Sequence, residues 1–233
     1  MSRYWFIRCR WPVAIVATVF VVAIVAGSLW TLWVPHWRPS LQPSRGERYG
    51  IDVSAYQGNI DWNTVATDDI TFAYIKATEG GDFTDRKFDK NWRGAGTSGI
   101  DRGAYHYLTL CTDGIIQARH FLSVAPPDAN ALAPVLDLED LMGRCNPEAS
   151  EVVKQVDRFI AEVERHSPQP MVLYIGSDFQ AKFGLPRGLR RDLWQRSLVR
   201  RPSTDDWVIW QFHYRARVNG IRGDVDLDVM RSG

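Results

Sequence analysis

The stretch APVLDLED, residues 133–140, has the apolar character of a buried strand, yet it carries the carboxylates Asp137, Glu139 and Asp140. Burying an unpaired carboxylate is costly, so these side chains need a reason to be there. Residues two apart on a strand point to the same face, with backbones separated by about 6.6–6.8 Å. We therefore expect Asp137 and Glu139 to face one cavity, and Asp140 to point away and begin a loop.

Similar short apolar runs recur through the rest of the chain. They predict strands at 49–54, 71–77, 103–108, 134–139, 171–176, 192–197, 207–212 and 224–229. Segments with helical patterns separate them, at 61–66, 87–98, 114–124 and 149–166. This alternation predicts an α/β fold, an irregular (β/α) TIM-like barrel of up to eight strands; an open doubly wound sheet is the alternative. The last third has little room for helices, so hairpins or loops are expected there.

Reactive groups of β/α barrels collect at the carboxyl ends of the strands. Polar side chains stand late in most of the predicted strands: Asp52, Lys76, Glu79, Tyr105, His106, Asp137, Glu139, Tyr174 and Gln211. Any one of them can be a structural polar residue held by a neighbour. Their convergence on one rim favours a site.

Two carboxyl groups in one cavity raise each other's pKa, and burial raises it further. One of Asp137 and Glu139 would then keep a proton near neutral pH, as a general acid must. Two other interpretations stay open. One is a structural salt bridge to Lys76 or an arginine. The other is a metal site, which the scarcity of strand histidines (His106 and His213) disfavours. We expect no cofactor and no metal.

Composition sets broad limits on the function. The chain has 233 residues, enough for one sizeable core, and 45% of them are hydrophobic. A net charge of +1 gives no indication of a nucleic-acid partner. Ten tryptophans and eight tyrosines fit both a core packed with large rings and stacking against sugars. Composition does not choose between these two roles.

The N-terminal segment is different in kind. Residues 1–10 are basic, and residues 11–34 contain no charged side chain. This uncharged run is long enough for a membrane-spanning helix, which needs about 20 residues. Arginines before this run and none until Arg38 predict a single-pass anchor in the inner, cytoplasmic membrane, with a cytoplasmic N-terminus and an extracytoplasmic (periplasmic) domain. The alternative is a cleaved signal peptide whose apolar core closes at Ala26, which would give a secreted protein.

Residues 35–47 are proline-rich and predict a linker, so the folded domain is expected over 48–233. The cysteines follow the same division of the chain. Cys9 would be cytoplasmic, whereas Cys111 and Cys145 would lie outside, where disulfides persist. One disulfide between these two is the simplest arrangement, and two free thiols are the alternative. We expect a monomer.

Several segments also match one family in order along the chain. They are YGIDVSAYQGNIDW (49–62), FAYIKATEG (72–80), GAYHYL (103–108), PVLDLE (134–139), LYIG (173–176), WQF (210–212) and VNGIRGDVDLDVM (218–230). In these segments the sequence resembles glycoside hydrolase family 25, the Chalaropsis-type lysozymes. A lone Asp-x-Glu would be weak support, whereas this ordered set covers nearly all of 49–230.

The resemblance implies a muramidase, an enzyme that hydrolyses the β-1,4 bond between N-acetylmuramic acid and N-acetylglucosamine in peptidoglycan. It implies that Glu139 is the general acid and that Asp137 orients either the 2-acetamido group of the substrate or a water. Asp52 and Asp226 match the other two active-site aspartates of the family and would stabilise charge and position the sugar. Asp228 is the near competitor for the place of Asp226. Glu79 would line the cleft.

Flat rings in the matched segments offer surfaces for sugars. Tyr105, Tyr174 and Trp210 are candidates for this role, with plain core packing as the alternative for each, and His106 and Gln211 complete the predicted substrate-binding set. Two departures from the family pattern stand out. Residues 193–202 place Gln195 and Arg196 where the family has an aromatic and alanine-containing strand. The chain also lacks cell-wall-binding repeats, which an anchor could replace.

Two rival functions differ from the muramidase in kind. One is a non-catalytic glycan-binding or scaffold protein on the same barrel, which the presence of all four carboxylates disfavours. The other is a hydrolase of a different N-acetylglucosamine polymer, which a mechanism assisted by the 2-acetamido group would tolerate.

Overall fold

The computed structural model describes residues 18–19, 21–25, 44, 46–139, 147–184, 191–198, 200–203 and 206–231. The chain divides into two compact units, residues 1–39 and residues 40–233. In the first unit, residues 18–19 and 21–25 are helical and exposed. Over the described residues, no helix has the length and apolar character needed to span a bilayer. Most of the predicted anchor at 11–34 lies outside the described residues.

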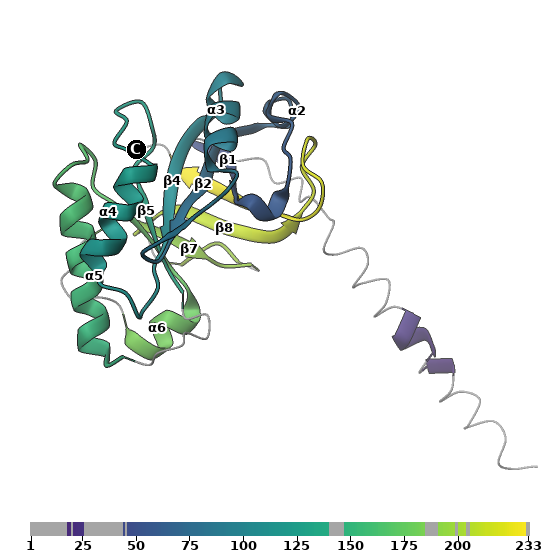
Figure 1. The fold of residues 1–233 in the computed structure, drawn as a ribbon. Helices are drawn as coiled ribbons and strands as arrows, with labels where there is room; N and C mark the ends of the chain where they lie inside the picture. The colour runs from purple at the N-terminus through teal and green to yellow at the C-terminus, as the bar shows by residue number, and fades with distance from the viewer. Residues whose placement is uncertain are drawn as a thin grey trace, which may run out of the picture. The chain divides into compact units, whose positions relative to one another are not determined.

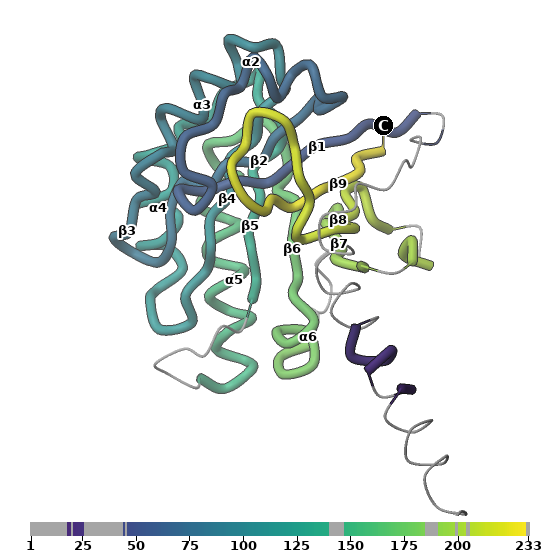
Figure 2. The backbone as a smooth tube through the Cα atoms, turned by 90° about the vertical axis from the view of Figure 1, so that its right-hand side faces the viewer, coloured from purple at the N-terminus to yellow at the C-terminus, as the bar shows by residue number. Residues whose placement is uncertain are grey.

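Eight strands of the second unit close into a barrel (Figures 1 and 2). They are β1 (Glu47–Val53), β2 (Ile70–Glu79), β4 (Asp101–Tyr107), β5 (Val135–Leu138), β6 (Val172–Ile175), β7 (Leu193–Arg196), β8 (Trp207–Ala216) and β9 (Val225–Arg231). A short strand β3 (Phe83–Thr84) pairs with the end of β2 and stays outside the ring. All eight predicted strands are confirmed, and the pairing of β1 with both β2 and β9 excludes the open sheet.

One strand of the barrel runs against the others. Strands β1, β2 and β4–β8 run parallel to one another, whereas β9 is antiparallel to both of its neighbours, β8 and β1. The predicted loop connection of the closing strands is found between β8 and β9, which are joined through residues 217–224 without a helix, whereas residues 177–183 between β6 and β7 are helical. The start of β9 therefore meets the ends of the other strands at one rim. This register places Asp226 directly opposite Asp52.

Helices cover part of the outside of the barrel, next to β2 and β4. They are η2 (Ala55–Gln57), α2 (Trp62–Ala66), α3 (Phe88–Thr97), α4 (Gly114–Val124), α5 (Ala149–Glu164) and α6 (Ser177–Phe183). The four predicted helices are confirmed, and η2 and α6 are additions. Helix α4 begins where the Asp113 carboxylate accepts hydrogen bonds from the amides of Ile115 and Ile116. Helices α4 and α5 lie side by side on one flank (Figure 1).

The alternation of side chains along each strand creates two separate cores. The outer core lies between strands and helices and includes Ile51, Ile75, Leu136 and Phe159. The inner core fills the barrel below the rim, with Phe72, Tyr74, Val135, Val172, Tyr174, Trp194 and Ile209. Large rings fill the interior below the rim where the strand ends meet.

Candidate active site

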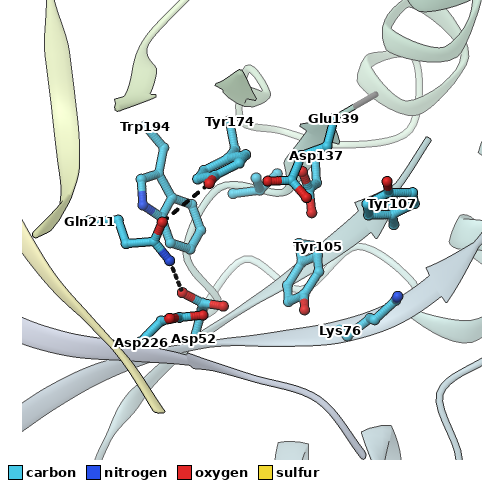
Figure 3. A pocket seen from close by; sticks show the side chains of 11 residues that line it. Asp52, Lys76, Tyr105, Tyr107, Asp137, Glu139, Tyr174, Trp194, Gln211 and Asp226 are labelled. Atoms are coloured by element: carbon cyan, nitrogen blue, oxygen red, sulfur yellow. Dashed lines mark hydrogen bonds between the residues drawn. The ribbon is translucent and has the colours of Figure 1, made fainter. Parts of the chain in front are cut away.

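A cavity of about 240 Å³ opens at this rim (Figure 3). It is lined by Asp52, Lys76, Tyr105, Tyr107, Val135, Asp137, Glu139, Tyr174, Trp194, Gln211 and Asp226. Two pairs of carboxylates face each other across it: Asp137 and Glu139 come from the end of β5, and Asp52 and Asp226 come from β1 and β9. Strands β5 and β9 stand opposite each other in the ring, which explains this separation.

Most of the predicted site residues meet in this cavity. The four carboxylates line it together with Tyr105, Tyr174 and Gln211. Asp137 and Glu139 lie on the same side of the barrel wall, as their spacing predicts. Asp228, the competitor of Asp226, points into the barrel one layer deeper and is fully buried below the cavity.

Three predicted substrate-binding residues lie elsewhere. His106 alternates with Tyr105 and Tyr107, so its ring points outward into the helix-covered core, where it stacks on Phe159 at 4.7 Å between ring centroids. Trp210 likewise alternates with Gln211 and packs outside the barrel, donating its indole N–H to the Ser197 carbonyl at 2.8 Å.

Glu79 is the third of these residues. It stands at the rim without lining the cavity, and its carboxylate pairs with Lys76 at 2.6 Å.

Sequence reasoning missed Trp194 as a wall of the cavity, along with Tyr107 and Val135. Residues 195 and 196, which depart from the family pattern, follow Trp194 directly in the same strand. Counting by twos backwards from Arg196 places Trp194 on the same strand face. Its indole N–H donates to the Asp228 carboxylate at 3.0 Å, which fixes the ring against the inner core.

The salt-bridge interpretation of Asp137 does not hold over the described residues. Lys76 pairs with Glu79, and Asp137 forms no ion pair there; its Oδ1 is buried without a hydrogen-bond partner. Burial, followed by the charge of Glu139, raises the pKa of Asp137 well above its ordinary value, and Lys76 opposes this in part. Asp137 therefore holds a proton more tightly than an exposed aspartate.

Glu139 lies nearer the cavity mouth. Burial raises its pKa above the ordinary value, while the hydroxyl of Tyr174 and the charge of Arg196 lower it. Asp137 and Glu139 therefore sit in an environment that favours one shared proton over two negative charges. This is the arrangement that a general acid needs.

Asp52 and Asp226, on the opposite wall of the cavity, also have raised pKa values. Burial, followed by the charges of Asp226 and Asp228, raises the pKa of Asp52 well above its ordinary value. Burial raises the pKa of Asp226 to about 7, against the opposing charge of Arg196. Gln211 orients this side, because its side-chain amide donates to Asp52 at 3.3 Å and its carbonyl accepts from the Tyr174 hydroxyl at 3.2 Å.

The remaining predictions concern metals and cysteines. In the described ranges, no group of three or more His, Cys, Asp or Glu side chains is arranged to hold a metal ion. Cys111 is disulfide-bonded. Its predicted partner, Cys145, lies outside the described residues, so the pairing stays a prediction.

Comparisons with known proteins agree with this architecture. The family model for glycosyl hydrolases family 25 matches residues 51–221. The chain is 35% identical over 190 residues to "Uncharacterized protein YegX" of Escherichia coli (strain K12), covering 78% of this chain and 68% of that protein. It is 32% identical over 197 residues to Lysozyme M1 of Streptomyces globisporus, covering 76% and 65%.

A solved structure extends the comparison to three dimensions. The family 25 glycosyl hydrolase from Bacillus anthracis superimposes with a TM-score of 0.74 at 32% identity, over 82% of this chain and 91% of that one. The family match spans most of the barrel and includes Asp52, Asp137 and Glu139, whereas Asp226 follows the matched range. The chain belongs to glycosyl hydrolases family 25.

Proposed function

We propose that this chain is a muramidase that hydrolyses the β-1,4 bond between N-acetylmuramic acid and N-acetylglucosamine in peptidoglycan. One observation carries the proposal: a family 25 barrel opens into a cavity that holds two opposed pairs of carboxyl groups. The similarity to Lysozyme M1 supports the choice of substrate.

Glu139 is the general acid in this proposal. Glycoside hydrolysis needs one protonated and one ionised carboxyl group around an oxocarbenium-like transition state. Glu139 gives its proton to the glycosidic oxygen as the bond from that oxygen to the anomeric carbon breaks. A water then adds to the anomeric carbon, and its proton returns to a carboxylate. The position of Glu139 in the cavity wall and its raised pKa support this role.

Asp137 assists from the same strand. Its carboxyl group is more deeply buried than that of Glu139 and faces the same cavity. It orients either the 2-acetamido group of the substrate or the attacking water. Across the cavity, Asp52 and Asp226 stabilise the positive charge that develops on the sugar, and the hydrogen bond from Gln211 holds Asp52 in place.

The decisive experiment incubates the purified chain with peptidoglycan and identifies the released muropeptides by mass spectrometry. New reducing ends at muramic acid are expected. Glu139→Gln should lower kcat by about 10²- to 10⁴-fold, the usual contribution of a general acid. Its melting temperature should stay near that of the parent, because the amide keeps the shape of the carboxyl group. Glu151→Gln on the outer helix α5 is the matched control and should keep its activity.

Three outcomes of the same experiment would contradict the proposal. Products that end in N-acetylglucosamine, or cleavage of chitin alone, would indicate a hydrolase of another polymer. Binding of peptidoglycan without cleavage would indicate a scaffold protein. An active Glu139→Gln enzyme would remove the general acid from this residue.

We also propose that residues 11–34 anchor the enzyme in the cytoplasmic membrane, with the catalytic domain outside and acting as a monomer. The uncharged run between Arg10 and Arg38 supports this. Alkaline phosphatase fused after residue 40 should be active, whereas a fusion that lacks residues 1–34 should not. An inactive fusion after residue 40 would reverse the orientation, and recovery of the fusion from the medium would favour a cleaved signal peptide.

A further inference from the structure

A second hollow adjoins the catalytic cavity. It has a volume of about 340 Å³ and is lined by Tyr56, Gln57, Tyr214, Arg215, Asp224, Val225 and Asp226. Asp226 belongs to both hollows, so a glycan strand that passes through the cavity can continue into this one. Two exposed rings are available there, because Tyr56 is 84% and Tyr214 is 49% exposed. Such rings are suited to stacking against sugars.

Arg196 neighbours one residue from the lining of each hollow, Gln211 of the catalytic cavity and Tyr214 of the second hollow. It is the last residue of β7 and is paired in register with Gln211, which lines the catalytic cavity. Its guanidinium lies over the ring of Tyr214, 5.6 Å from the ring centroid. The contact with the ring favours this position of the planar head group and leaves the N–H edges of the guanidinium unused. Its charge also lowers the pKa of Glu139 and of Asp226, in agreement with this position.

Arg196 differs from the neighbouring cations in having no carboxylate partner. Lys76 is paired with Glu79 at 2.6 Å, and Arg215 is paired with Asp224 at 2.9 Å. Arg196 forms no hydrogen bond or ion pair with any residue that the structure describes, and it is exposed. A guanidinium that lies on a ring with its donors free is suited to binding a carboxylate.

The acidic residues around the cavity explain why a carboxylate-binding cation is needed there. Asp52, Asp137, Glu139, Asp226 and Asp228 cluster in and below the cavity, and those of them that ionise disfavour an anionic ligand. Peptidoglycan carries carboxylates, on the lactyl ether of muramic acid where no peptide is attached and on the peptide stem where one is. A glycan with these groups needs a cation at the mouth of this acidic cavity.

We propose that Arg196, which lies over Tyr214, is a specificity-determining residue that binds a carboxylate of the bound glycan. The inference rests on the muramidase function and deepens it. It makes the enzyme selective for glycans that carry an acid over neutral N-acetylglucosamine polymers. The second hollow, with Tyr56 and Tyr214, then acts as a further sugar subsite.

The test measures binding by calorimetry in the Glu139→Gln chain, whose slow turnover preserves the probes, with and without Arg196→Gln. Four probes are used: a free-acid tetrasaccharide of alternating N-acetylglucosamine and N-acetylmuramic acid, its lactyl carboxamide, the same tetrasaccharide with peptide stems, and chitotetraose. Arg196→Gln should weaken binding of an acid-bearing probe by about fivefold, the effect of one partly exposed ion pair. It should leave binding of the carboxamide and of chitotetraose unchanged.

Comparison of the four probes identifies which group of the glycan supplies the carboxylate. A loss with the free-acid tetrasaccharide assigns the lactyl group, and a loss only with the stem-bearing probe assigns the peptide. Arg196→Lys, which keeps the charge without the planar fork, should recover part of the affinity. Arg93→Gln, which removes one exposed positive charge from the outer helix α3, should change none of the four affinities.

Two results would overturn the inference. Equal losses for the acidic and the neutral probes would mean that Arg196 acts only by packing on Tyr214. Unchanged affinities for all probes would mean that it does not contact the glycan. With either result, the muramidase assignment still holds if the wild-type chain releases muropeptides. If the wild-type chain cleaves nothing but Arg196→Gln still weakens binding of the acidic probes, only the catalytic function is refuted.

Discussion

At the residue scale, the unusual feature is a fully buried aspartate below the catalytic cavity. Asp228 accepts the indole N–H of Trp194 with one carboxylate oxygen, and its other oxygen has no hydrogen-bond partner over the described residues. Burial, followed by the charge of Asp226, raises the pKa of Asp228 well above its ordinary value. The folded protein therefore binds this proton more tightly than the unfolded chain does.

The raised pKa of Asp228 makes the stability of the folded protein fall as the pH rises. The stability that protonated Asp228 contributes is fully present below the unfolded-state pKa of about 3.9 and is lost as the pH rises through the folded-state pKa. Asp228→Asn keeps an oxygen for Trp194 and removes the titration. We expect the variant to match the parent at pH 4 and to exceed its free energy of unfolding by about 1–2 kcal/mol at pH 7.

Urea unfolding at the two pH values measures this effect. Trp194→Phe is the control: it removes the hydrogen-bond donor and should lower stability at both pH values. A less stable Asp228→Asn protein at pH 7 would show that the ionised carboxylate is compensated in the native state, contrary to this interpretation.

At the element scale, the alternation of strand residues decides which predicted residues reach the site. Tyr105 and Tyr107 line the cavity, whereas His106 between them belongs to the outer core. There it is hydrogen-bonded to Thr78 at 2.7 Å and to Gln117 at 3.2 Å, and burial lowers its pKa to about 3. A neutral, enclosed imidazole explains a polar residue in this strand without any role in binding substrate.

The same alternation makes a glycine necessary in β1. A Cβ added at Gly50 would lie 2.4 Å from ring atoms of Phe72, which fills the bottom of the barrel. Gly50→Ala should therefore destabilise the protein by about 1–3 kcal/mol, the usual cost of overpacking. Phe72→Leu in the same chain should recover part of this loss, because it makes room for the methyl group.

A double-mutant cycle of unfolding free energies checks this prediction. Additive effects of Gly50→Ala and Phe72→Leu would contradict it, since they would place the strain somewhere other than the contact between these two residues.

At the scale of the whole molecule, the closure of the barrel assembles the site from distant parts of the chain. Strand β9 lies antiparallel between β8 and β1, so Asp226 meets Asp52 from the far end of the sequence. The spacing of Asp137 and Glu139 is enough to predict that they share a face, because the two residues are close in sequence. The pairing of Asp226 with Asp52 depends on the direction of β9, which the strand pattern alone did not give.

The predicted disulfide is also a property of the whole molecule. Cys111 is disulfide-bonded, and a bond to Cys145 would leave only Cys9 reduced. Thiol titration of the denatured, unreduced chain should therefore find one reactive thiol, and prior reduction should expose three. Peptide mapping should recover residues 111 and 145 in one cross-linked fragment. Three thiols before reduction would refute the bond.

The sequence by itself determined the eight strands, the four main helices and the family, because apolar periodicity and short motifs are local properties of the chain. It also placed Asp137 and Glu139 on one face, since that depends only on a spacing of two. The tertiary structure alone decided that Trp194 lines the cavity, that His106 faces the helices, that Trp210 packs outside the barrel, and that Lys76 pairs with Glu79. These facts depend on which way each strand faces and on which strands close the ring, and both are set by packing between residues far apart in the chain.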